Sequence, residues 1–467
     1  MFRRPSSPPR NALARWVCVG ALAFAPAIVR AATEEPHELE ESTSTELDKL
    51  RPLIDAKNWG AAIDLIRGIQ AKVGPDSYDN AFVSNILAKL FLQKGDYTKV
   101  VEPWETVLRL QETHHYLDDK DIQDILYFLA QIYGQEASNS KVPAVIQQNY
   151  SKAAELLKRW MANTKKPPTS NERQDAEIFY SSVLYNLAVA NGEVNKPMLK
   201  QAEEEIQKGL RMTPRPKEGF YQLLLAISQQ ENNYPRLAEL LEILVKQFPQ
   251  KKDYWSQLEN IYLNLAQQEA KNETLAREYN IRAIYTIERA QQLGFLKTPK
   301  DNYTLVGIYF NIGQFGRATE LLHAGLRDGS IESEQKNWEL LAYSYQQVDK
   351  PYEAIDVLTE GAKHFPRSGQ LDYQAAQVYY SLNKAAEAYK ALMVATTKGH
   401  LEKPASVYGF VGYVAWELGK LEEALEAVNK ALSLPDSKKD EQLPKLKSAI
   451  QDALNQRAAQ LASPNKR

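Results

Sequence analysis

Histidines and carboxylates are the side chains in this sequence that could do acid–base or metal chemistry. The histidines are scattered, and the adjacent pair His114 and His115 would point about 100° apart on a helix, which is poor geometry for a shared metal. The sequence has no phosphate-binding loop, dinucleotide fingerprint, zinc-protease motif, nucleophile elbow or EF-hand loop. The acidic run Glu203 to Glu205 has the pattern of a solvated helix face, and no carboxylate has a context that would bury it and raise its pKa. We therefore predict no catalytic residue, no metal site, no cofactor and no enzymatic activity.

The elements that would position any functional side chain are helices arranged in a repeat. Apolar residues recur at three- and four-residue spacing, and no segment shows the alternation that is typical of a strand. The anchor residues of each unit recur after about 34 residues. The clearest unit has the anchors Trp338, Leu341, Ala342, Tyr345, Ala354, Leu358 and Pro366. At these positions small residues let two helices approach closely, and large residues fill the space to the next unit.

These anchors resemble the tetratricopeptide repeat, whose unit is an antiparallel helical hairpin. The resemblance implies an all-α, tetratricopeptide-like solenoid of about ten hairpins, closed by a C-terminal capping helix from Asp440 to about Leu461. The hairpin that opens at Trp255 is expected to be lengthened, because its later anchors begin only at Ala283. The predicted organisation is a signal peptide at 1–31, an acidic flexible spacer at 32–45, divergent hairpins at 46–217, a regular array at 218–435, and a capping helix with tail at 436–467.

An aromatic stripe follows the first helix of four consecutive hairpins. In proteins of this family, ligands lie along the concave surface that the first helices form. The positions that would face this surface hold Tyr303, Phe310, Tyr343, Tyr373, Tyr380, Tyr413 and Trp416. Exposed rings give a large contact area at a small entropic cost, so we predict that these residues form a protein-binding groove. The alternative is ordinary packing, in which the curvature of the array buries the rings.

The N-terminal residues have the layout of an export signal. Arginines, without any acid, flank an apolar run from Trp16 to Val29, and Val29 and Ala31 suit a cleavage site after Ala31. The alternative is an uncleaved anchor. Cys18 is the sole cysteine and lies inside this run, so the mature chain would have no disulfide. The whole chain has a net charge of −2, and loss of the basic leader makes it more acidic, so nucleic acid is not expected as a partner.

A more specific resemblance covers residues from Tyr221 to Leu454. The segments Leu223 to Gln230, Lys246 to Leu258 and Ala290 to Leu296 resemble exported tetratricopeptide proteins of Gram-negative bacteria that are regarded as accessory components of TonB-type energy-transduction systems. The resemblance implies a non-catalytic periplasmic scaffold, with proteins or peptides of the cell envelope, such as TonB-type complex components, as partners and with no membrane span after leader cleavage. The alternative is an envelope-biogenesis scaffold that holds peptidoglycan enzymes or outer-membrane proteins.

Overall fold

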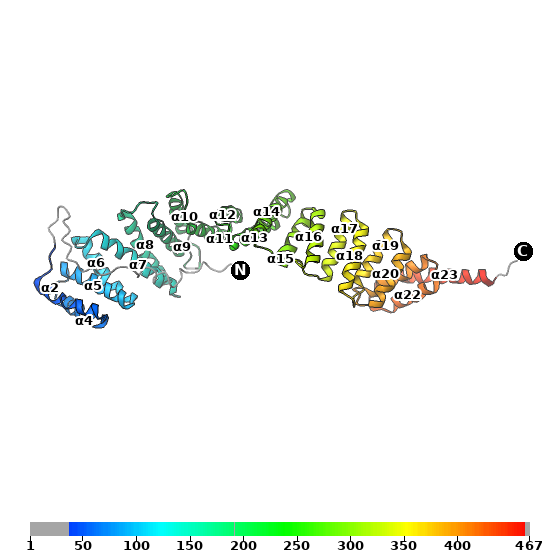
Figure 1. The fold of residues 1–467 in the computed structure, drawn as a ribbon, viewed down its shortest axis with the longest axis horizontal. Coiled ribbons are helices and arrows are strands. Elements are labelled where there is room, and N and C mark those ends of the chain that lie inside the picture. Colours follow the sequence, from blue (N-terminus) through cyan, green and yellow to red (C-terminus); the bar gives the residue numbers. More distant parts are fainter. Residues whose placement is uncertain (1–36, 191, 463–467) are drawn as a thin grey trace. The chain divides into compact units, whose positions relative to one another are not determined.

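The structure is a computed structural model that describes residues 37–190 and 192–462. In these residues helices follow one another through short turns, and there are no strands (Figure 1). The all-α, tetratricopeptide-like solenoid of helical hairpins predicted from the sequence is confirmed. The chain forms two compact units that divide between Leu240 and Leu241. The predicted signal peptide lies outside the described residues.

The described part of the first unit begins inside the segment that was expected to be a flexible acidic spacer. Helix α2 starts at Glu41, its residue Thr43 is buried, and the backbone N–H of Glu40 donates to the Asp79 carboxylate at 3.2 Å. The segment is therefore held against a later helix from Glu40 on. The helices of this unit are α2 (Glu41–Leu47), α3 (Leu50–Asp55), α4 (Trp59–Gln70), α5 (Tyr78–Lys94), α6 (Val101–His114), α7 (Asp119–Asn139), α8 (Pro143–Asn163), α9 (Asn171–Val189), α10 (Lys196–Leu210) and α11 (Glu218–Gln230), with a short 3₁₀ helix η1 (Tyr97–Val100).

Helix α12 (Tyr234–Gln247) contains the division, and the second unit continues from it. The hairpin from Trp255 is lengthened as predicted, because its helices have 17 and 20 residues whereas α17 and α18 have 13 and 14. The helices are α13 (Lys252–Gln268), α14 (Glu273–Gln292), α15 (Pro299–Asn311), α16 (Phe315–Asp328), α17 (Gln335–Gln347), α18 (Pro351–His364), α19 (Gln370–Ser381), α20 (Ala385–Lys398), α21 (Pro404–Glu417), α22 (Leu421–Ser433) and α23 (Gln442–Ala462), with a 3₁₀ helix η2 (Pro435–Lys439).

The turn inside each regular hairpin has the same backbone conformation. Residue Asp349, between α17 and α18, has a φ of 56°, and the next N–H, of Lys350, donates to the Tyr345 carbonyl at 2.9 Å. This bond closes a helix C-terminus around a left-handed residue, a conformation that Gly, Asn and Asp adopt at the least cost. The equivalent turns of the second unit have Gly313, Asn383 and Gly419 at this position.

The core of the second unit contains the predicted close approach between helices. Ala354 is fully buried, and Trp338 is 1% exposed, with its indole N–H donating to Ser333 Oγ at 2.9 Å. Gly361 lies directly beneath this ring, because a Cβ there would be 2.8 Å from Trp338 Cγ. Large and small residues therefore interlock at the repeat anchors, as the sequence predicts.

Tyrosines of the first helix in several hairpins connect three consecutive helices. The Tyr262 hydroxyl on α13 donates to Glu242 of α12 at 2.9 Å and bonds to Arg282 of α14. Burial, and then the bond to Glu242, raise the pKa of Tyr262 to about 12, so it keeps its donor proton. The same acid–tyrosine–base arrangement recurs at Tyr133 with Glu105 and Lys152, and at Tyr309 with Glu288 and Arg317.

The last helix, α23, covers the end of the repeat, as predicted. Its side chains Leu443 and Ile450 are buried, and Ile450 packs with Ala415, Ala424 and Val428. An apolar face of the final hairpin would otherwise be exposed. Within the described residues, no helix combines the length and the apolar character that crossing a bilayer requires.

Candidate functional site

The predicted aromatic stripe lies on the first helices α15, α17, α19 and α21, and the structure divides it into exposed and packed rings. Tyr343 is 51% exposed, Tyr413 is 40% exposed, and Tyr303 and Trp416 are each 36% exposed. Tyr373 and Tyr380 are half-buried and rest on the core with one side. Phe310 packs into the core and against Phe315, whose ring lies 5.7 Å away, so its environment is that of a packing residue.

Five of the rings on α19 and α21 form one continuous patch. Phe410 contacts both Tyr373 and Tyr380 edge-to-face, with ring centroids 6.3 and 5.3 Å apart. Tyr380 then contacts Tyr413 at 5.9 Å, and Tyr413 contacts Trp416 at 6.2 Å. These distances are in the range in which aromatic pairs attract one another. We call the set Tyr373, Tyr380, Phe410, Tyr413 and Trp416 the aromatic surface.

Hydrogen bonds fix the orientation of the rings at the centre of the aromatic surface. The Tyr380 hydroxyl donates to Glu417 Oε2 at 2.9 Å, which ties α19 to the end of α21. The bond with Tyr413, together with burial and Glu417, raises the pKa of Tyr380, so its hydroxyl stays protonated at neutral pH. Gln377 Nε2 donates to the Tyr373 hydroxyl at 2.9 Å. The centre of the patch is therefore arranged before any partner arrives.

The helices that carry the rings have few charges. Helix α21 has one charged side chain, Glu417, and α19 has one, Asp372, which pairs with Lys398 at 2.7 Å. Helices α15 and α17 each carry one lysine and one acid. The aromatic surface therefore offers a partner mainly ring area, with the Glu417 carboxylate at its edge.

Phe410 and Glu417 belong to this site but were missed by the sequence analysis. Phe410 lies directly before Val411, which is buried, and was not among the positions expected to face a ligand. The available signal was its spacing of three residues from Tyr413 on the same helix, which places both side chains on neighbouring parts of one face.

Two carboxylates correct the prediction that no acid is buried with a raised pKa. Glu177 on α9 is 2% exposed, and burial followed by repulsion from Glu205 raises its pKa to about 7. Glu259 on α13 is 8% exposed, and burial followed by repulsion from Asp301 raises its pKa to about 7. The side chain of Glu205, in the acidic run that was predicted to be solvated, is only 17% exposed and pairs with Lys208 at 2.7 Å. The helical spacing of Gln174, Glu177 and Ser181, all buried on α9, was the overlooked signal.

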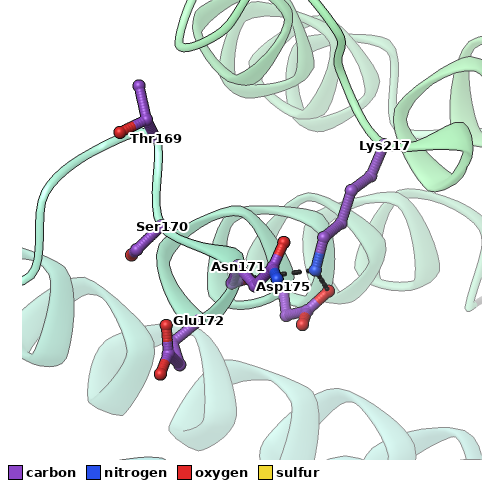
Figure 2. A pocket seen from close by; sticks show the side chains of 6 residues that line it. All are labelled: Thr169, Ser170, Asn171, Glu172, Asp175 and Lys217. Carbon is purple, nitrogen blue, oxygen red and sulfur yellow. Dashed lines mark hydrogen bonds and ion pairs between the residues drawn. The ribbon is translucent and has the colours of Figure 1, made fainter.

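A polar pocket lies at the start of α9, where Lys217 reaches across from the residue before α11 (Figure 2). The Lys217 ammonium donates to the Asn171 carbonyl at 3.1 Å and to Asp175 Oδ1 at 2.7 Å. Glu172, on the same wall, accepts from Lys166 at 3.3 Å. The charged groups of this pocket are thus paired within the protein, and we assign it no ligand.

The histidine pair His114–His115 ends helix α6. His114 stacks on Tyr116 with ring centroids 4.8 Å apart, and His115 has a left-handed backbone with a φ of 50°. The pair therefore belongs to a helix end with an aromatic contact. Across residues 37–190 and 192–462, no group of three or more His, Cys, Asp or Glu side chains is placed to hold a metal ion.

The family model of the tetratricopeptide repeat matches residues 405–437, which contain α22 and all of α21 except its first residue, Pro404. Among solved structures, the chain is similar to the MamA protein (18% identity over 38% of this chain and 93% of MamA, TM-score 0.30). It is also similar to YrrB, a tetratricopeptide protein with an unusual peptide-binding site (15% identity over 47% of this chain and 99% of YrrB, TM-score 0.31). A third similar structure is yeast Tom70 (12% identity over 90% of this chain and 97% of Tom70, TM-score 0.29). No curated protein matches the sequence. The matched repeat is the hairpin that carries Phe410, Tyr413 and Trp416.

Proposed function

Because this chain is a tetratricopeptide-repeat protein, we propose that it is a non-catalytic periplasmic scaffold that binds protein partners through its aromatic surface. The observation that carries this proposal is the continuous run of rings from Tyr373 to Trp416 on two first helices. Exposed tyrosine and tryptophan with a polar rim are typical of the energetic centre of protein interfaces.

The packing of the rings supports a binding role over a purely structural one. Tyr413 and Trp416 contact each other while leaving about a third or more of their area exposed. A ring that serves the core alone is buried like Trp338, which is 1% exposed. The rings of Tyr373, Tyr380 and Phe410 are partly buried and contact the exposed rings. Their side chains are already held in place, so binding a partner would cost little of their conformational entropy.

The proposed partner class and compartment come from the sequence. Residues 221–454 resemble accessory components of TonB-type energy-transduction systems, and residues 1–31 have the layout of a cleaved signal peptide. The specific proposal is therefore an accessory scaffold of a TonB-type transport system in the periplasm.

Affinity capture from periplasmic extract tests the binding role. We expect the wild-type chain to retain TonB-type complex components, and the double variant Tyr413→Ala/Trp416→Ala to lose them. Truncation of an interface hot spot costs about 2 kcal/mol or more, which is roughly thirtyfold in affinity. The matched control is Tyr285→Ala, since this tyrosine is 57% exposed but lies on α14, the second helix of its hairpin.

Capture by the double variant that equals wild type would refute the aromatic surface as the binding site. Retention of peptidoglycan enzymes or outer-membrane proteins in place of TonB-type components would favour the envelope-biogenesis alternative.

Export is tested separately by mass spectrometry of the protein recovered from its native compartment. We expect a periplasmic protein whose N-terminus is at or near Ala32, because a signal peptidase would cleave after Ala31. Intact leader on membrane-bound protein would instead establish the anchor, and intact leader on cytoplasmic protein would contradict export.

A further inference from the structure

The hydrogen bond between Tyr380 and Glu417 is a tyrosine–acid pair that has no base beside it. At Tyr133, by contrast, the hydroxyl donates to Glu105, and the Lys152 ammonium bonds to both groups and lies 4.7 Å from the centroid of the tyrosine ring. Within the described residues, Glu417 forms no ion pair with a lysine or arginine, and it accepts from the neutral Tyr380 hydroxyl. The Glu417 carboxylate therefore keeps an unpaired negative charge.

The second helices of the same two hairpins show what a complete arrangement looks like. The Tyr389 hydroxyl on α20 donates to Glu423 of α22. Lys420 pairs with the same carboxylate at 3.1 Å, and its ammonium lies 4.6 Å from the centroid of the Tyr389 ring. Tyr380 and Glu417 connect the first helices, α19 and α21, in the same way. The tyrosine and the acid are thus in place on the aromatic surface, and a base is missing.

The lysines that follow α19 and α21 in the chain are engaged elsewhere. The ammonium of Lys384, the residue before α20, lies 5.0 Å from the ring centroid of Tyr352 on α18. Lys420, the residue before α22, pairs with Glu423. In the part of the chain that the structure describes, no lysine or arginine lies over a ring of the aromatic surface. These residues therefore supply no positive charge for Glu417.

We propose that the aromatic surface binds a basic side chain of its partner, a lysine or arginine that pairs with Glu417 and packs against Tyr413 and Trp416. This inference rests on the proposed function and specifies the partner of the same site. Tyr413 lies one helical turn before Glu417 and contacts Trp416, so the carboxylate and both exposed rings border one area. The faces of tyrosine and tryptophan attract a cation, and the carboxylate adds a charge-assisted hydrogen bond.

Neutral and acidic segments fit the same area less well. A neutral segment would remove water from Glu417 without supplying an opposite charge, which costs free energy. An acidic segment would be repelled by Glu417, and the negative faces of the rings would not attract it. The unpaired carboxylate among exposed rings therefore discriminates between partners by the sign of their charge.

The test uses a short, fluorescently labelled peptide of alternating arginine and serine, and the same peptide with citrulline in place of every arginine. Citrulline has nearly the shape of arginine but carries no charge, so the two peptides isolate the contribution of the charge. We expect the purified chain to bind the arginine peptide, as measured by fluorescence anisotropy at constant ionic strength. The citrulline peptide should bind at least about tenfold more weakly.

Glu417→Gln keeps an acceptor for the Tyr380 hydroxyl but removes the charge. It should weaken binding of the arginine peptide about tenfold, because hydrogen bonds to charged groups are stronger than neutral ones, and should leave binding of the citrulline peptide unchanged. The matched control is Glu426→Gln, since Glu426 is exposed on α22, the second helix of the same hairpin, and its loss changes the net charge equally. Both variants should melt near the wild-type temperature, because both side chains are exposed.

Three results would overturn the inference. The first is an arginine peptide that binds no more tightly than the citrulline peptide. The second is weakening of the arginine peptide to the same extent by Glu417→Gln and Glu426→Gln, which would indicate attraction by net charge alone. The third is capture of envelope proteins that depends on Tyr413 and Trp416 but is unchanged in Glu417→Gln, and this result would leave the proposed function standing. Capture that is independent of Tyr413 and Trp416 would refute the proposed function and this inference with it.

Discussion

Replacing Glu177 by glutamine should stabilise the protein at pH 8 and have little effect at pH 4. The folded pKa of Glu177 is about 7 against an ordinary value of 4.5, chiefly because the side chain is buried and faces Glu205. The unfolded chain releases this proton above pH 4.5 while the folded chain retains it. The contribution of Glu177 to stability is therefore fully present below pH 4.5 and is lost as the pH rises through about 7. The difference corresponds to about 3 kcal/mol.

The Glu177→Gln variant removes the charge at every pH and keeps a donor that can bond to Glu205. Arg173 and Lys208, the bases nearest to Glu177, lower its pKa but do not outweigh burial. Urea unfolding followed by circular dichroism between pH 4 and 8, at constant ionic strength, measures the effect. The variant should retain the pH dependence that Glu259 contributes in the same direction, because burial also raises the pKa of Glu259 to about 7. Glu204→Gln, an exposed neighbour of Glu205, is the control. A wild-type pH dependence in Glu177→Gln would show that its proton does not contribute to folding.

The repeat architecture was predictable because each unit depends on local residues. Ala354 and Leu358 are buried where the pattern placed them, and α18 ends at His364, just before Pro366. These features follow from helical periodicity, small residues at close contacts and helix-stopping signals, all of which are encoded within one hairpin. The capping helix was predictable for a related reason, since a terminal unit needs its apolar face covered.

Contacts between hairpins were not predictable in the same way. Tyr262 follows Trp255 by seven residues, as Tyr345 follows Trp338. Its bond to Glu242, however, depends on how α12 and α13 are rotated against each other. The burial of Glu177 likewise depends on where α10 places Glu205. Both outcomes are set by packing geometry that residue types along one helix do not specify.

In the aromatic stripe, too, the position of the rings was predictable from the sequence, whereas their packing against the next hairpin was not. The sequence placed rings on the first helices, and four of them, Tyr303, Tyr343, Tyr413 and Trp416, are exposed. It did not distinguish Phe310, which packs against Phe315 and the core, and it omitted Phe410, which joins the neighbouring rings. A repeat register gives the direction of a side chain, whereas its exposure depends on what the next hairpin covers.

Two tryptophans give the sharpest contrast between the core and the surface of this repeat. Trp338→Ala should cost about 3–5 kcal/mol of unfolding free energy, because it leaves a large cavity in the core. The ring is 1% exposed, stacks on His364 at 5.3 Å and lies over Gly361. Trp416→Ala should cost about 1 kcal/mol or less, since its ring is 36% exposed and borders solvent.

The same unfolding experiment applied to both variants separates a packing role from a binding role. We expect the melting temperature of Trp338→Ala to fall by several degrees and that of Trp416→Ala to stay near wild type. Partner capture should show the opposite order when both are assayed well below their melting temperatures, with Trp416→Ala the weaker binder. Equal destabilisation by the two substitutions would mean that Trp416 packs as a core residue and is not a binding residue of the aromatic surface.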